Sequence, residues 1–408
     1  MTLLAVMGNP QEAYPSIHIA GTNGKGSVSA MVSGVLIEAG YRIGIFTSPH
    51  LHSYCERFRI DREMIQEQRL EEVVRSLEPG IEECVTRGLG QPTEFEVLTA
   101  AAFVYFQQEG VDLAVVETGM GGIYDSTNVL KRPLVTVITN VQKDHEAYLG
   151  SEVAEIAANK AGIAKLDVPL ICGDQASEVA EILRQMVMDR GGIFSRSDQG
   201  VELKNITNLG MEGFLVDYQI HRAAGQKVKF SLAGSYQMQN LTTALAVLNN
   251  LNEQGFNVSS DAINRALGRM TWPGRVELVH RQPDVVLDAA HNPHGARGLA
   301  RALRDIYPER SKILVVGVVD DKNGPEIFKE LKDMTRLCIV TRPEGARGKN
   351  WMQKLEEARG IFAETIGVEQ IEEAVKTGIQ LAEPDEYLLV TGSFYTLDRA
   401  RRLFTDTY

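Results

Sequence analysis

The chain has 408 residues, with 42 Lys and Arg against 54 Asp and Glu, which gives a formal net charge of −12. A chain of this length exceeds one compact core, so two domains are expected. The acidic balance argues against a nucleic-acid partner, and an anionic ligand must therefore be bound by a local group of positive charges.

The four cysteines, at positions 55, 84, 172 and 338, form no C-x-x-C pair and no short even spacing. They indicate neither a zinc site nor a disulfide framework, and reduced, buried thiols are expected. The first residues contain no basic segment ahead of an apolar run, and no stretch of 18 apolar residues occurs in the sequence. We therefore expect a cytoplasmic protein with neither a signal peptide nor a membrane-spanning segment.

The first predicted element is an apolar strand near Ile17 that runs into a glycine-rich loop, Gly21-Thr22-Asn23-Gly24-Lys25-Gly26-Ser27. A helix is predicted directly after this loop because apolar residues recur at helical spacing from Val28 to Ala39. Backbone N–H groups of such a loop attract phosphate oxygens, glycines allow close approach, and a lysine adds a positive charge. The loop therefore predicts a nucleotide-binding site.

Apolar runs typical of strands then alternate with helical patterns. Strands are predicted at 43–47, 113–117, 134–140 and 168–172, and helices near 67–78, 95–108, 151–163 and 176–190. This alternation is typical of a parallel α/β sheet.

The second half of the chain repeats the α/β pattern after an interruption. Residues 200–232 predict a small β annex, a helix is predicted at 239–249, and Trp272-Pro-Gly-Arg275 breaks the pattern, so a domain boundary is predicted near 271–276. Strands at 285–288, 312–319, 337–341 and 386–391 follow, without a second phosphate loop. We predict an α/β protein with a parallel-sheet phosphate-loop domain and β annex at 1–271, and a Rossmann-like α/β domain at 272–408 that completes the site.

Two chemically informative groups follow predicted strand ends, where open α/β sheets bind ligands. Glu117 ends an apolar run and precedes a second glycine turn, Thr-Gly-Met-Gly-Gly122. A carboxylate there is suited to hold Mg²⁺ between two phosphates, because hard cations prefer carboxylate oxygen; a surface carboxylate at a turn is the alternative. His145 lies five residues after Asn140, and by itself it is more typical of a hydrogen-bonded loop histidine.

Sequence blocks between about residue 8 and about residue 397 resemble one known family. The phosphate loop departs from the consensus G-x-x-x-x-G-K-[ST], because its first gap is shorter and a glycine separates Lys25 from Ser27. This G-T-N-G-K-G-S form is similar to that of the Mur ligase superfamily, in its folylpolyglutamate synthase and dihydrofolate synthase branch. The other blocks that carry the resemblance are Thr47-Ser-Pro-His50-Leu, Glu56-Arg-Phe-Arg59-Ile, Phe95-Glu-Val-Leu-Thr99, Glu117-Thr-Gly-Met-Gly-Gly, Asp125-Ser-Thr-Asn128, Asp144-His145, Lys160-Ala-Gly-Ile163, Gln237-Met-Gln-Asn240, Trp272-Pro-Gly-Arg275, Asp288-Ala-Ala-His291-Asn-Pro293, Asp321-Lys322 and Thr391-Gly-Ser393.

The resemblance implies a role for each matching residue. Loop 21–27 would wrap the triphosphate of ATP, with Lys25 on the β and γ phosphates. The implied Mg²⁺ ligands, for two ions, are Ser48, Glu117, His145 and Lys160, the last carbamylated by CO₂ and so converted from a cation into a carboxylate-like anion. The residues implied to close on the nucleotide or its metal are Asn240, Arg275, Asp288 and His291, and Ser393 with His291 would meet the incoming amino acid.

The same resemblance implies ATP-dependent amide formation. A substrate carboxylate would attack the γ-phosphate to give an acyl phosphate, which the α-amine of L-glutamate then attacks. Lys25, Lys160, Arg275 and His291 are the implied catalytic residues; for Arg275 there is also a physical reason, since a guanidinium stabilises charge that develops on a transferring phosphate. Closure of the domains would protect the acyl phosphate from water.

The implied substrates are small molecules: L-glutamate and a folate or pteroate, either tetrahydrofolate, dihydropteroate or both. The loop 48–60, with Arg57 and Arg59, is the expected wall of the acceptor pocket, and a solvated charged loop is the alternative. A monomer without nucleic-acid or membrane partners is expected.

Several positions depart from the family pattern. Ile123-Tyr124 replaces Arg-Leu, Asn159 replaces Glu, Gln142-Lys143 replaces a small and an apolar residue, and Tyr236 replaces a frequent His. Fewer than twenty residues precede the first strand, where an extra helix is usual, so we expect either a truncated start or a different pterin pocket. Three alternatives therefore stay open: a Mur-type ligase for a non-folate acid, a phosphate-loop kinase or GTPase, and a non-catalytic binding protein.

Overall fold

The computed structural model describes residues 1–405, which pack as two compact units. The first unit comprises residues 1–206, 216–229 and 238–270, and the second comprises 207–215, 230–237 and the chain from Thr271 onward. Residues 207–215 and 230–237 thus pack with the second unit although they precede Thr271. The predicted single boundary near 271–276 does not include these two segments.

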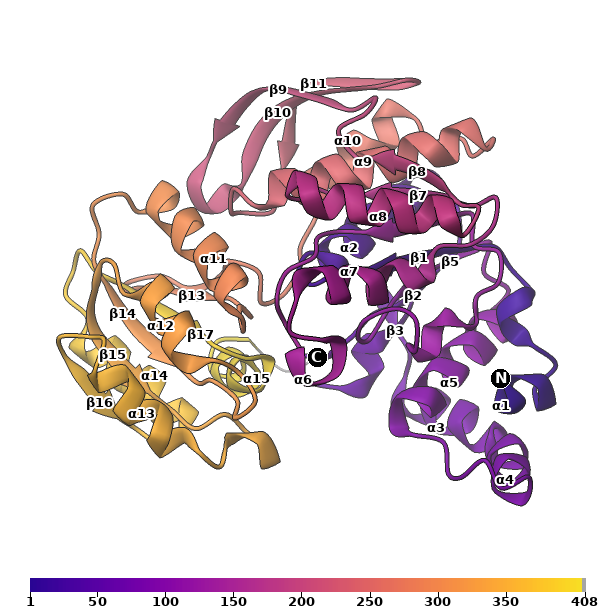
Figure 1. Cartoon of the computed structure of the whole chain (residues 1–408). Helices are drawn as coiled ribbons and strands as arrows, with labels where there is room; N and C mark the ends of the chain where they lie inside the picture. Colours follow the sequence, from indigo (N-terminus) through magenta and orange to yellow (C-terminus); the bar gives the residue numbers. More distant parts are fainter. Residues whose placement is uncertain (406–408) are drawn as a thin grey trace. The chain divides into compact units, whose positions relative to one another are not determined.

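The first unit is built on an eight-stranded sheet in the order β4-β3-β2-β5-β1-β6-β7-β8 (Figure 1). Its six parallel strands are β1 (Ser16–Ala20), β2 (Ile43–Phe46), β5 (Leu113–Glu117), β6 (Val135–Ile138), β7 (Pro169–Cys172) and β8 (Ile193–Arg196). Two short antiparallel strands, β3 (Phe58–Ile60) and β4 (Glu63–Met64), extend one edge. The apolar runs of the sequence are the central strands, because a parallel strand covered on both faces is apolar throughout.

Helices cover both faces of this sheet. On one face, α5 (Glu94–Glu109) packs over β2, β3 and β5, and α7 (Val153–Lys160) and α8 (Ser177–Asp189) pack over β6 and β7. On the other, α2 (Lys25–Glu38) contacts β1, β2 and β5 and is covered in turn by α10 (Ser260–Gly268). The remaining helices are α1 (Thr2–Val6), α3 (Glu67–Ser76), α4 (Glu78–Thr86), α6 (Glu146–Leu149) and α9 (Gln237–Glu253).

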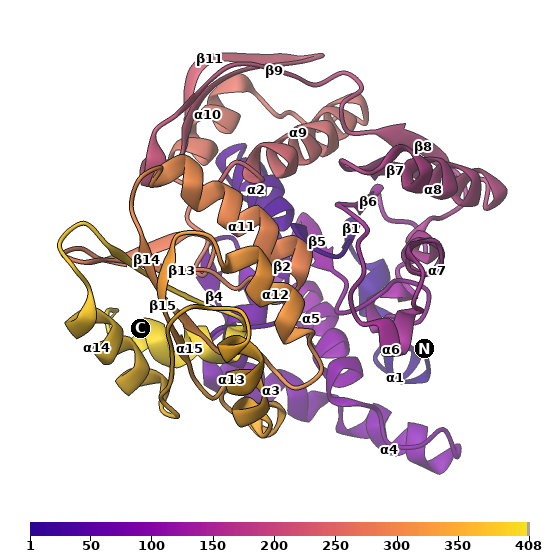
Figure 2. The same cartoon turned by 60° about the vertical axis from the view of Figure 1, so that its left-hand side comes forward.

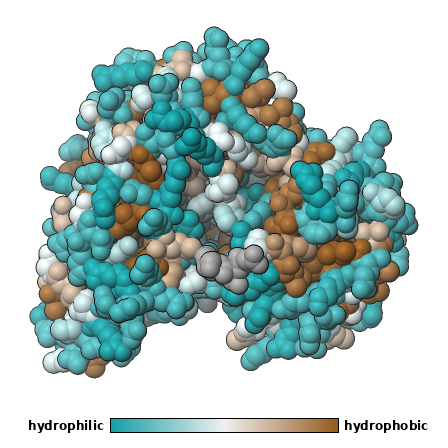
Figure 3. All heavy atoms as spheres, turned by 180° about the vertical axis from the view of Figure 1, so that it is seen from behind, coloured by the Kyte–Doolittle hydropathy of each residue, from teal (hydrophilic) through white to brown (hydrophobic). Residues whose placement is uncertain are grey.

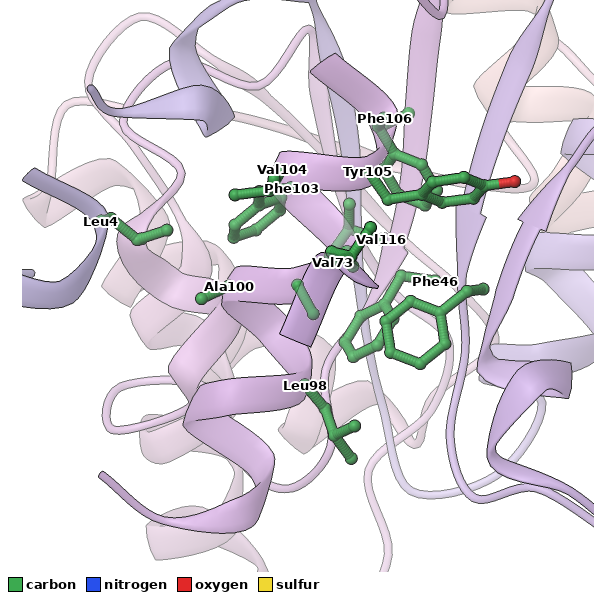
Figure 4. Close-up of a cluster of buried hydrophobic side chains, with 14 of the residues drawn as sticks. Leu4, Phe46, Val73, Leu98, Ala100, Phe103, Val104, Tyr105, Phe106 and Val116 are labelled. Carbon is green, nitrogen blue, oxygen red and sulfur yellow. The ribbon is translucent and has the colours of Figure 1, made fainter. Parts of the chain in front are cut away.

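A large apolar cluster of the first unit lies between α5 and the sheet. Figure 4 shows Phe46 of β2 and Val116 of β5 beside Phe103 and Phe106 of α5. Helix α5 begins at a capping box, in which Thr93 accepts a hydrogen bond from Glu96 N and the Glu96 side chain accepts one from Thr93 N. Gly44 of β2 is required here, since a Cβ at this position would lie 2.8 Å from the ring of Phe106.

The predicted β annex is a three-stranded sheet in the order β11-β10-β9. Its strands are β9 (Glu202–Asn208), β10 (Phe214–Ile220) and β11 (Ala223–Phe230). Alternate residues of β10 and β11 are buried, which is the pattern of strands with one covered face.

The second unit contains a six-stranded sheet in the order β12-β13-β17-β14-β15-β16. The strands are β12 (Glu277–His280), β13 (Asp284–Leu287), β14 (Lys312–Val316), β15 (Thr335–Val340), β16 (Thr365–Gly367) and β17 (Tyr387–Thr391), all parallel except β12. The helices are α11 (Pro293–Ile306), α12 (Gly324–Leu331), α13 (Trp351–Arg359), α14 (Ile371–Leu381) and α15 (Phe394–Arg402). Figures 1 and 2 show α11 and α12 side by side.

The predicted α/β class with largely parallel sheets is confirmed, and the main predicted strands and helices lie within a few residues of the observed ones. The sequence patterns missed short elements, among them α1, α4 and α10. The face in Figure 3 is mainly hydrophilic, with hydrophobic patches between the charged residues. No helix in the described part of the chain is long and apolar enough to cross a membrane.

We expect Phe106→Ala to destabilise the first unit by about 3–5 kcal/mol, because the substitution leaves a cavity beside a fully buried sheet face. Urea unfolding followed by circular dichroism measures this change. Tyr148→Ala is the matched control, since Tyr148 is 76% exposed and its loss should change stability by less than about 0.5 kcal/mol. Equal effects of the two substitutions would contradict the packing described here.

Candidate active site

The glycine-rich loop connects the buried strand β1 to helix α2 in a backbone form that needs glycine at two positions. Gly21 has φ +150° and Gly24, the N-cap of α2, has φ +88°. A Cβ on Gly21 would lie 1.9 Å from the Thr139 hydroxyl oxygen, and one on Gly24 would lie 2.4 Å from Oδ1 of Asn240. The loop thus packs closely against the end of β6 and against α9, with Asn240 beside Gly24; the nucleotide-binding role of Asn240 stays a prediction.

The segment after β6 fixes the loop by hydrogen bonds. Thr22 N donates to Asn140 O at 2.8 Å and Asn23 N donates to Asn140 Oδ1 at 2.9 Å. The Thr139 hydroxyl donates to Asn23 O at 2.7 Å, and Gln142 N donates to the Thr22 hydroxyl at 3.0 Å. The loop is therefore held in one shape by its neighbour in the sheet.

Two lysine side chains meet at the first residue of the loop. Lys25 Nζ donates to the Gly21 carbonyl oxygen at 3.2 Å, and Lys160 Nζ donates to the same oxygen at 3.0 Å. Glu117, at the end of β5, lies 3.8 Å from Lys25 and is 3% exposed. The structure therefore brings together three of the residues predicted for the site.

Lys160 is almost fully buried, with 3% of its surface exposed. Burial, reinforced by the nearby charge of Lys25, lowers the pKa of Lys160 to about 7, while Asp144 and Asp125 act in the opposite direction. A substantial fraction of its amines is thus neutral and nucleophilic near pH 7, which an exposed lysine is not.

The other predicted metal ligands are placed differently. The backbone N–H of Ser48 donates to Glu117 Oε2 at 3.4 Å, so Ser48 lies beside this carboxylate. His145 has φ +53° at the start of α6, and its Nε2 lies 4.0 Å from the Asp144 carboxylate. Among residues 1–405, no three His, Cys, Asp or Glu side chains are grouped so that they could hold a metal ion by themselves.

The chemistry of the donor set nevertheless suits Mg²⁺. Glu117 supplies a buried carboxylate and Ser48 a hydroxyl, and both are hard oxygen donors. The hydroxyl of Thr118, next in sequence to Glu117, is buried and has no hydrogen-bond partner in the described chain. A Mg²⁺ ion with few protein ligands and its remaining positions on phosphate oxygens fits such a site.

The second glycine turn, 119–122, packs directly against the end of α7 that carries Lys160. Gly122 N donates to Asn159 Oδ1 at 2.9 Å, and Ile123 N donates to Asn159 O at 3.0 Å. A Cβ on Gly122 would lie 2.8 Å from the carbonyl oxygen of Lys160. Asn159, where the family pattern usually has Glu, thus joins the turn to the helix and fixes Lys160.

The loop 48–60 holds its arginines by internal contacts. Arg57 Nε donates to His50 Nδ1 at 2.9 Å, and the Tyr54 ring lies 4.5 Å from the His50 ring and 5.3 Å from the Arg57 guanidinium. Arg59 Nε donates to the Glu56 carbonyl oxygen at 3.3 Å. Both arginines predicted to bind substrate therefore help to shape the loop itself.

The first unit also contains a cavity of about 360 Å³ that is not lined by this loop, and the sequence reasoning missed it. It lies between α1, α4, the N-terminal half of α5 and the short 3₁₀ helix Ser126–Val129 (η3). Its lining is mixed, with apolar side chains and a few polar groups: Met1, Thr2, Leu3, Leu4, Cys84, Leu89, Gly90, Gln91, Pro92, Glu96, Thr99, Ala100, Ser126 and Val129. The volume and mixed lining are typical of small-molecule pockets.

In the second unit, Asp288 lies directly after β13 and is 3% exposed. Its Oδ2 accepts hydrogen bonds from Val276 N at 2.9 Å and from the Tyr236 hydroxyl at 3.1 Å, and its Oδ1 accepts one from Ala290 N at 2.8 Å. Burial raises the pKa of Asp288, against the opposing effect of Arg275 and these hydrogen bonds. Tyr236, where the family pattern often has His, therefore orients the carboxylate.

Ser393, predicted to meet the incoming amino acid, caps helix α15. Its hydroxyl accepts a hydrogen bond from Thr396 N at 3.1 Å and lies 2.8 Å from the Thr396 hydroxyl, and Ser393 is 2% exposed. The Thr396 hydroxyl donates in turn to Gly317 O at 3.0 Å. The Ser393 hydroxyl is thus engaged in fixing the helix start.

The chain matches two families of known proteins. Residues 19–248 match the Mur ligase middle domain, and residues 274–394 match the Mur ligase, glutamate ligase domain. The chain belongs to the Mur ligase family. The resemblance noted from the sequence is confirmed.

Known relatives place the chain in one branch of this family. It is 31% identical to the dihydrofolate synthase/folylpolyglutamate synthase of Bacillus subtilis, over 98% of this chain and 93% of that protein. A structure of Mycobacterium tuberculosis folylpolyglutamate synthase complexed with ADP and AMPPCP superimposes with a TM-score of 0.93 at 32% identity, covering 100% of this chain and 94% of that chain. A further structure, an FPGS-AMPPCP-folate complex, superimposes with a TM-score of 0.82 at 29% identity, covering 99% and 94%.

The depressed pKa of Lys160 predicts a pH-dependent stability. Between pH 7 and about 10.5 the unfolded chain binds a proton at this lysine that the folded chain does not, so its contribution to stability rises with pH, by at most about 1.4 kcal/mol per unit. Lys160→Met removes this pH dependence. The free energy of unfolding of the variant should therefore exceed that of the wild type most at pH 6–7, and the difference should become smaller toward pH 9.5. Urea midpoints in CO₂-depleted buffer measure the difference, and a pH-independent difference would contradict the assignment.

Proposed function

We propose that this chain is an ATP-dependent ligase that joins L-glutamate to a folate, as tetrahydrofolate polyglutamylation, dihydrofolate formation from dihydropteroate, or both. The observation that carries the proposal is the convergence of Lys25 and Lys160 on the Gly21 carbonyl oxygen, with Glu117 3.8 Å from Lys25. Lys25, in a glycine-rich loop at a helix N-terminus, suits a triphosphate, and Lys160 meets the same loop from α7. The family membership and the nucleotide and folate complexes of similar proteins support the same conclusion.

In this proposal the protein first activates the carboxylate of the acceptor, so that an amine can attack it. The acceptor carboxylate attacks the γ-phosphate of ATP, the bond to the β-phosphate oxygen breaks, and ADP leaves. Lys25 offsets the repulsion between the two anions. Mg²⁺, for which Glu117, Ser48 and His145 are the proposed ligands, supplies further charge stabilisation when bound.

Lys160 is proposed to carry CO₂ as a carbamate. Its neutral amine attacks the carbon of CO₂, an N–C bond forms, and one amine proton is lost to solvent. The lowered pKa of Lys160 supports this step, because a protonated amine cannot attack. The product is an anionic oxygen donor at a position that otherwise holds a cation.

We further propose that the 360 Å³ cavity takes the ring system of the acceptor. Apolar side chains from α1 and α5 suit the faces of a planar ring, and the Ser126 and Thr99 side chains suit its polar edge. The Asp125 carboxylate, beside Ser126, is held by Met120 N at 2.8 Å and lies on the segment that follows Glu117. The residues that line this proposed pocket lie outside the loop 48–60, which the sequence predicted as the wall of the acceptor pocket.

For the second unit, we keep the roles that the resemblance implies. Arg275, Asp288 and His291 are proposed to serve the nucleotide and the incoming glutamate, since a guanidinium and an imidazole both suit anionic ligands.

Lys25→Ala and Glu117→Ala should each lower glutamate- and acceptor-dependent phosphate release from ATP by at least about 100-fold, because each removes a charge that acts on the transferring phosphate. Release is measured with dihydropteroate and with tetrahydrofolate as acceptors. Lys131→Ala is the matched control, since Lys131 is an exposed lysine that forms an ion pair with Glu12. Release that is equal with and without any acceptor would refute the proposed function.

Ser126→Phe should fill the cavity and raise the KM for the pterin acceptor by about 10-fold or more, while the KM for ATP changes less than 2-fold. Ser126→Ala is the control, since it removes the hydroxyl without filling the cavity, and it should raise the acceptor KM less than Ser126→Phe does. Steady-state kinetics with varied acceptor concentration provide the test. An unchanged acceptor KM in Ser126→Phe would place the acceptor ring elsewhere.

A further inference from the structure

Arg275 is held by an aromatic ring. Its guanidinium carbon lies 5.1 Å from the centre of the Phe394 ring, and its Nη1 donates to the Gly274 carbonyl oxygen at 3.1 Å. Within the part of the chain that the structure covers, no carboxylate forms an ion pair with this guanidinium. Most arginines of the second unit are different, since they are paired with Asp or Glu side chains.

Tyr395, the next residue of α15, also lies beside an arginine, but that arginine is ion-paired. The Arg347 guanidinium lies 5.9 Å from the centre of the Tyr395 ring, but it also forms a bidentate ion pair with Asp321. The charge of Arg347 is therefore compensated. Arg275 has the ring without an ion-paired carboxylate, although the charge of Asp288 acts on it through space.

The difference matters because the two contacts act differently on a cation. An aromatic face attracts a guanidinium through its quadrupole and adds no net negative charge. An ion pair also fixes the guanidinium, but it neutralises the charge and occupies the N–H donors that would meet a ligand. The Phe394 ring thus fixes Arg275 and leaves its charge available for an anion.

Phe394 also contacts His291. The two ring centres are 6.1 Å apart, and His291 Nδ1 lies 2.9 Å from the carbonyl oxygen of Ala289. A carbonyl oxygen only accepts hydrogen bonds, so Nδ1 carries the proton and the ring orientation is set from both sides. One aromatic ring therefore lies against two of the residues implied to bind nucleotide or amino acid.

The position of Phe394 is itself fixed by the start of α15. Phe394 is the first residue of this helix, and the preceding Ser393 is the buried N-cap described above. The Thr396 hydroxyl ties the same turn to Gly317 O, directly after β14. The cap thus sets the ring at the carboxyl end of the sheet.

We propose that Phe394 is a positioning residue of the ligase reaction, which orients Arg275 and His291 without neutralising the Arg275 charge. The reaction named here rests on the proposed function; the contact geometry does not. Three substitutions separate positioning from charge: Phe394→Leu removes the ring, Phe394→Tyr keeps it, and Phe394→Glu replaces it by a group that pairs with Arg275.

Phe394→Leu should lower kcat roughly 3- to 30-fold, the factor expected for a partly desolvated cation–π contact, with little change in acceptor KM. Phe394→Tyr should stay within 2-fold of the wild type, and Phe394→Glu should lose more than Phe394→Leu because it neutralises Arg275. Tyr395→Leu is the matched control, since it removes the equivalent ring from an already paired arginine, and it should stay within 2-fold.

A spectroscopic measurement on the full, ligand-free chain tests the contact itself. In protein labelled with ¹⁵N-arginine, the Arg275 Nε–Hε resonance, assigned by its loss in Arg275→Lys, should be displaced by the ring current in the wild type and in Phe394→Tyr. It should move toward the position of an unstacked arginine in Phe394→Leu. Circular dichroism and the thermal midpoint show whether each variant is folded.

The outcomes distinguish the two proposals. If the wild type shows acceptor-dependent turnover but Phe394→Leu has unchanged kcat, or if Phe394→Glu matches the wild type, the positioning role is overturned and the proposed function stands. Absence of the ring-current shift in the wild type also overturns it. A wild type without acceptor-dependent turnover overturns the proposed function, and the positioning role falls with it.

Discussion

Two lysine ammonium groups share one backbone acceptor at the start of the glycine-rich loop. Lys25 and Lys160 lie 3.2 Å and 3.0 Å from the Gly21 carbonyl oxygen, and the Glu117 carboxylate, 3.8 Å from Lys25, is the nearby anion that partly offsets them. Burial and the charge of Lys25 together lower the pKa of Lys160 to about 7, so Lys160 carries its proton only in part near neutral pH. The close-packed glycines and the hydrogen bonds that Asn140 accepts from Thr22 N and Asn23 N hold the loop in one shape, in which its N–H groups and Lys25 suit an anionic ligand.

The parts of the fold that depend on neighbouring residues could be predicted from the sequence. Loop 21–27 and its helix follow from glycine and lysine placement and from apolar spacing, and parallel strands covered on both faces are visible as apolar runs. Glu117 could be found because a carboxylate that ends such a run lies at the ligand edge of the sheet. Short helices such as α1 and α4 were not predicted, because five to nine residues contain too few helical turns for the spacing of apolar residues to distinguish a helix from a loop.

The rest could not be predicted because it depends on residues far apart in the chain. The cavity is lined by residues as far apart in sequence as Leu3 and Ser126. Arg275 and Phe394, which are in contact, are separated by more than a hundred positions. A pattern of neighbouring residues cannot predict contacts between residues so far apart in the sequence. Ser393 is a different case, since serine is a common N-cap residue and Ser393 caps α15; the ligand role that the family resemblance implies for it stays a prediction.

The chain holds two of its cations by opposite physical means, and the residue types follow from this. Lys160 is desolvated, which favours its neutral amine and makes it able to react with an electrophile near pH 7. Arg275 lies on an aromatic face, which attracts a cation without adding a negative charge beside it. A guanidinium keeps its proton in proteins and an amine loses it readily, so an arginine at position 160 could not act as a nucleophile, and a lysine at position 275 would lack the planar group that stacks on Phe394. The two positions are therefore not interchangeable, although both carry basic residues in a chain of net negative charge.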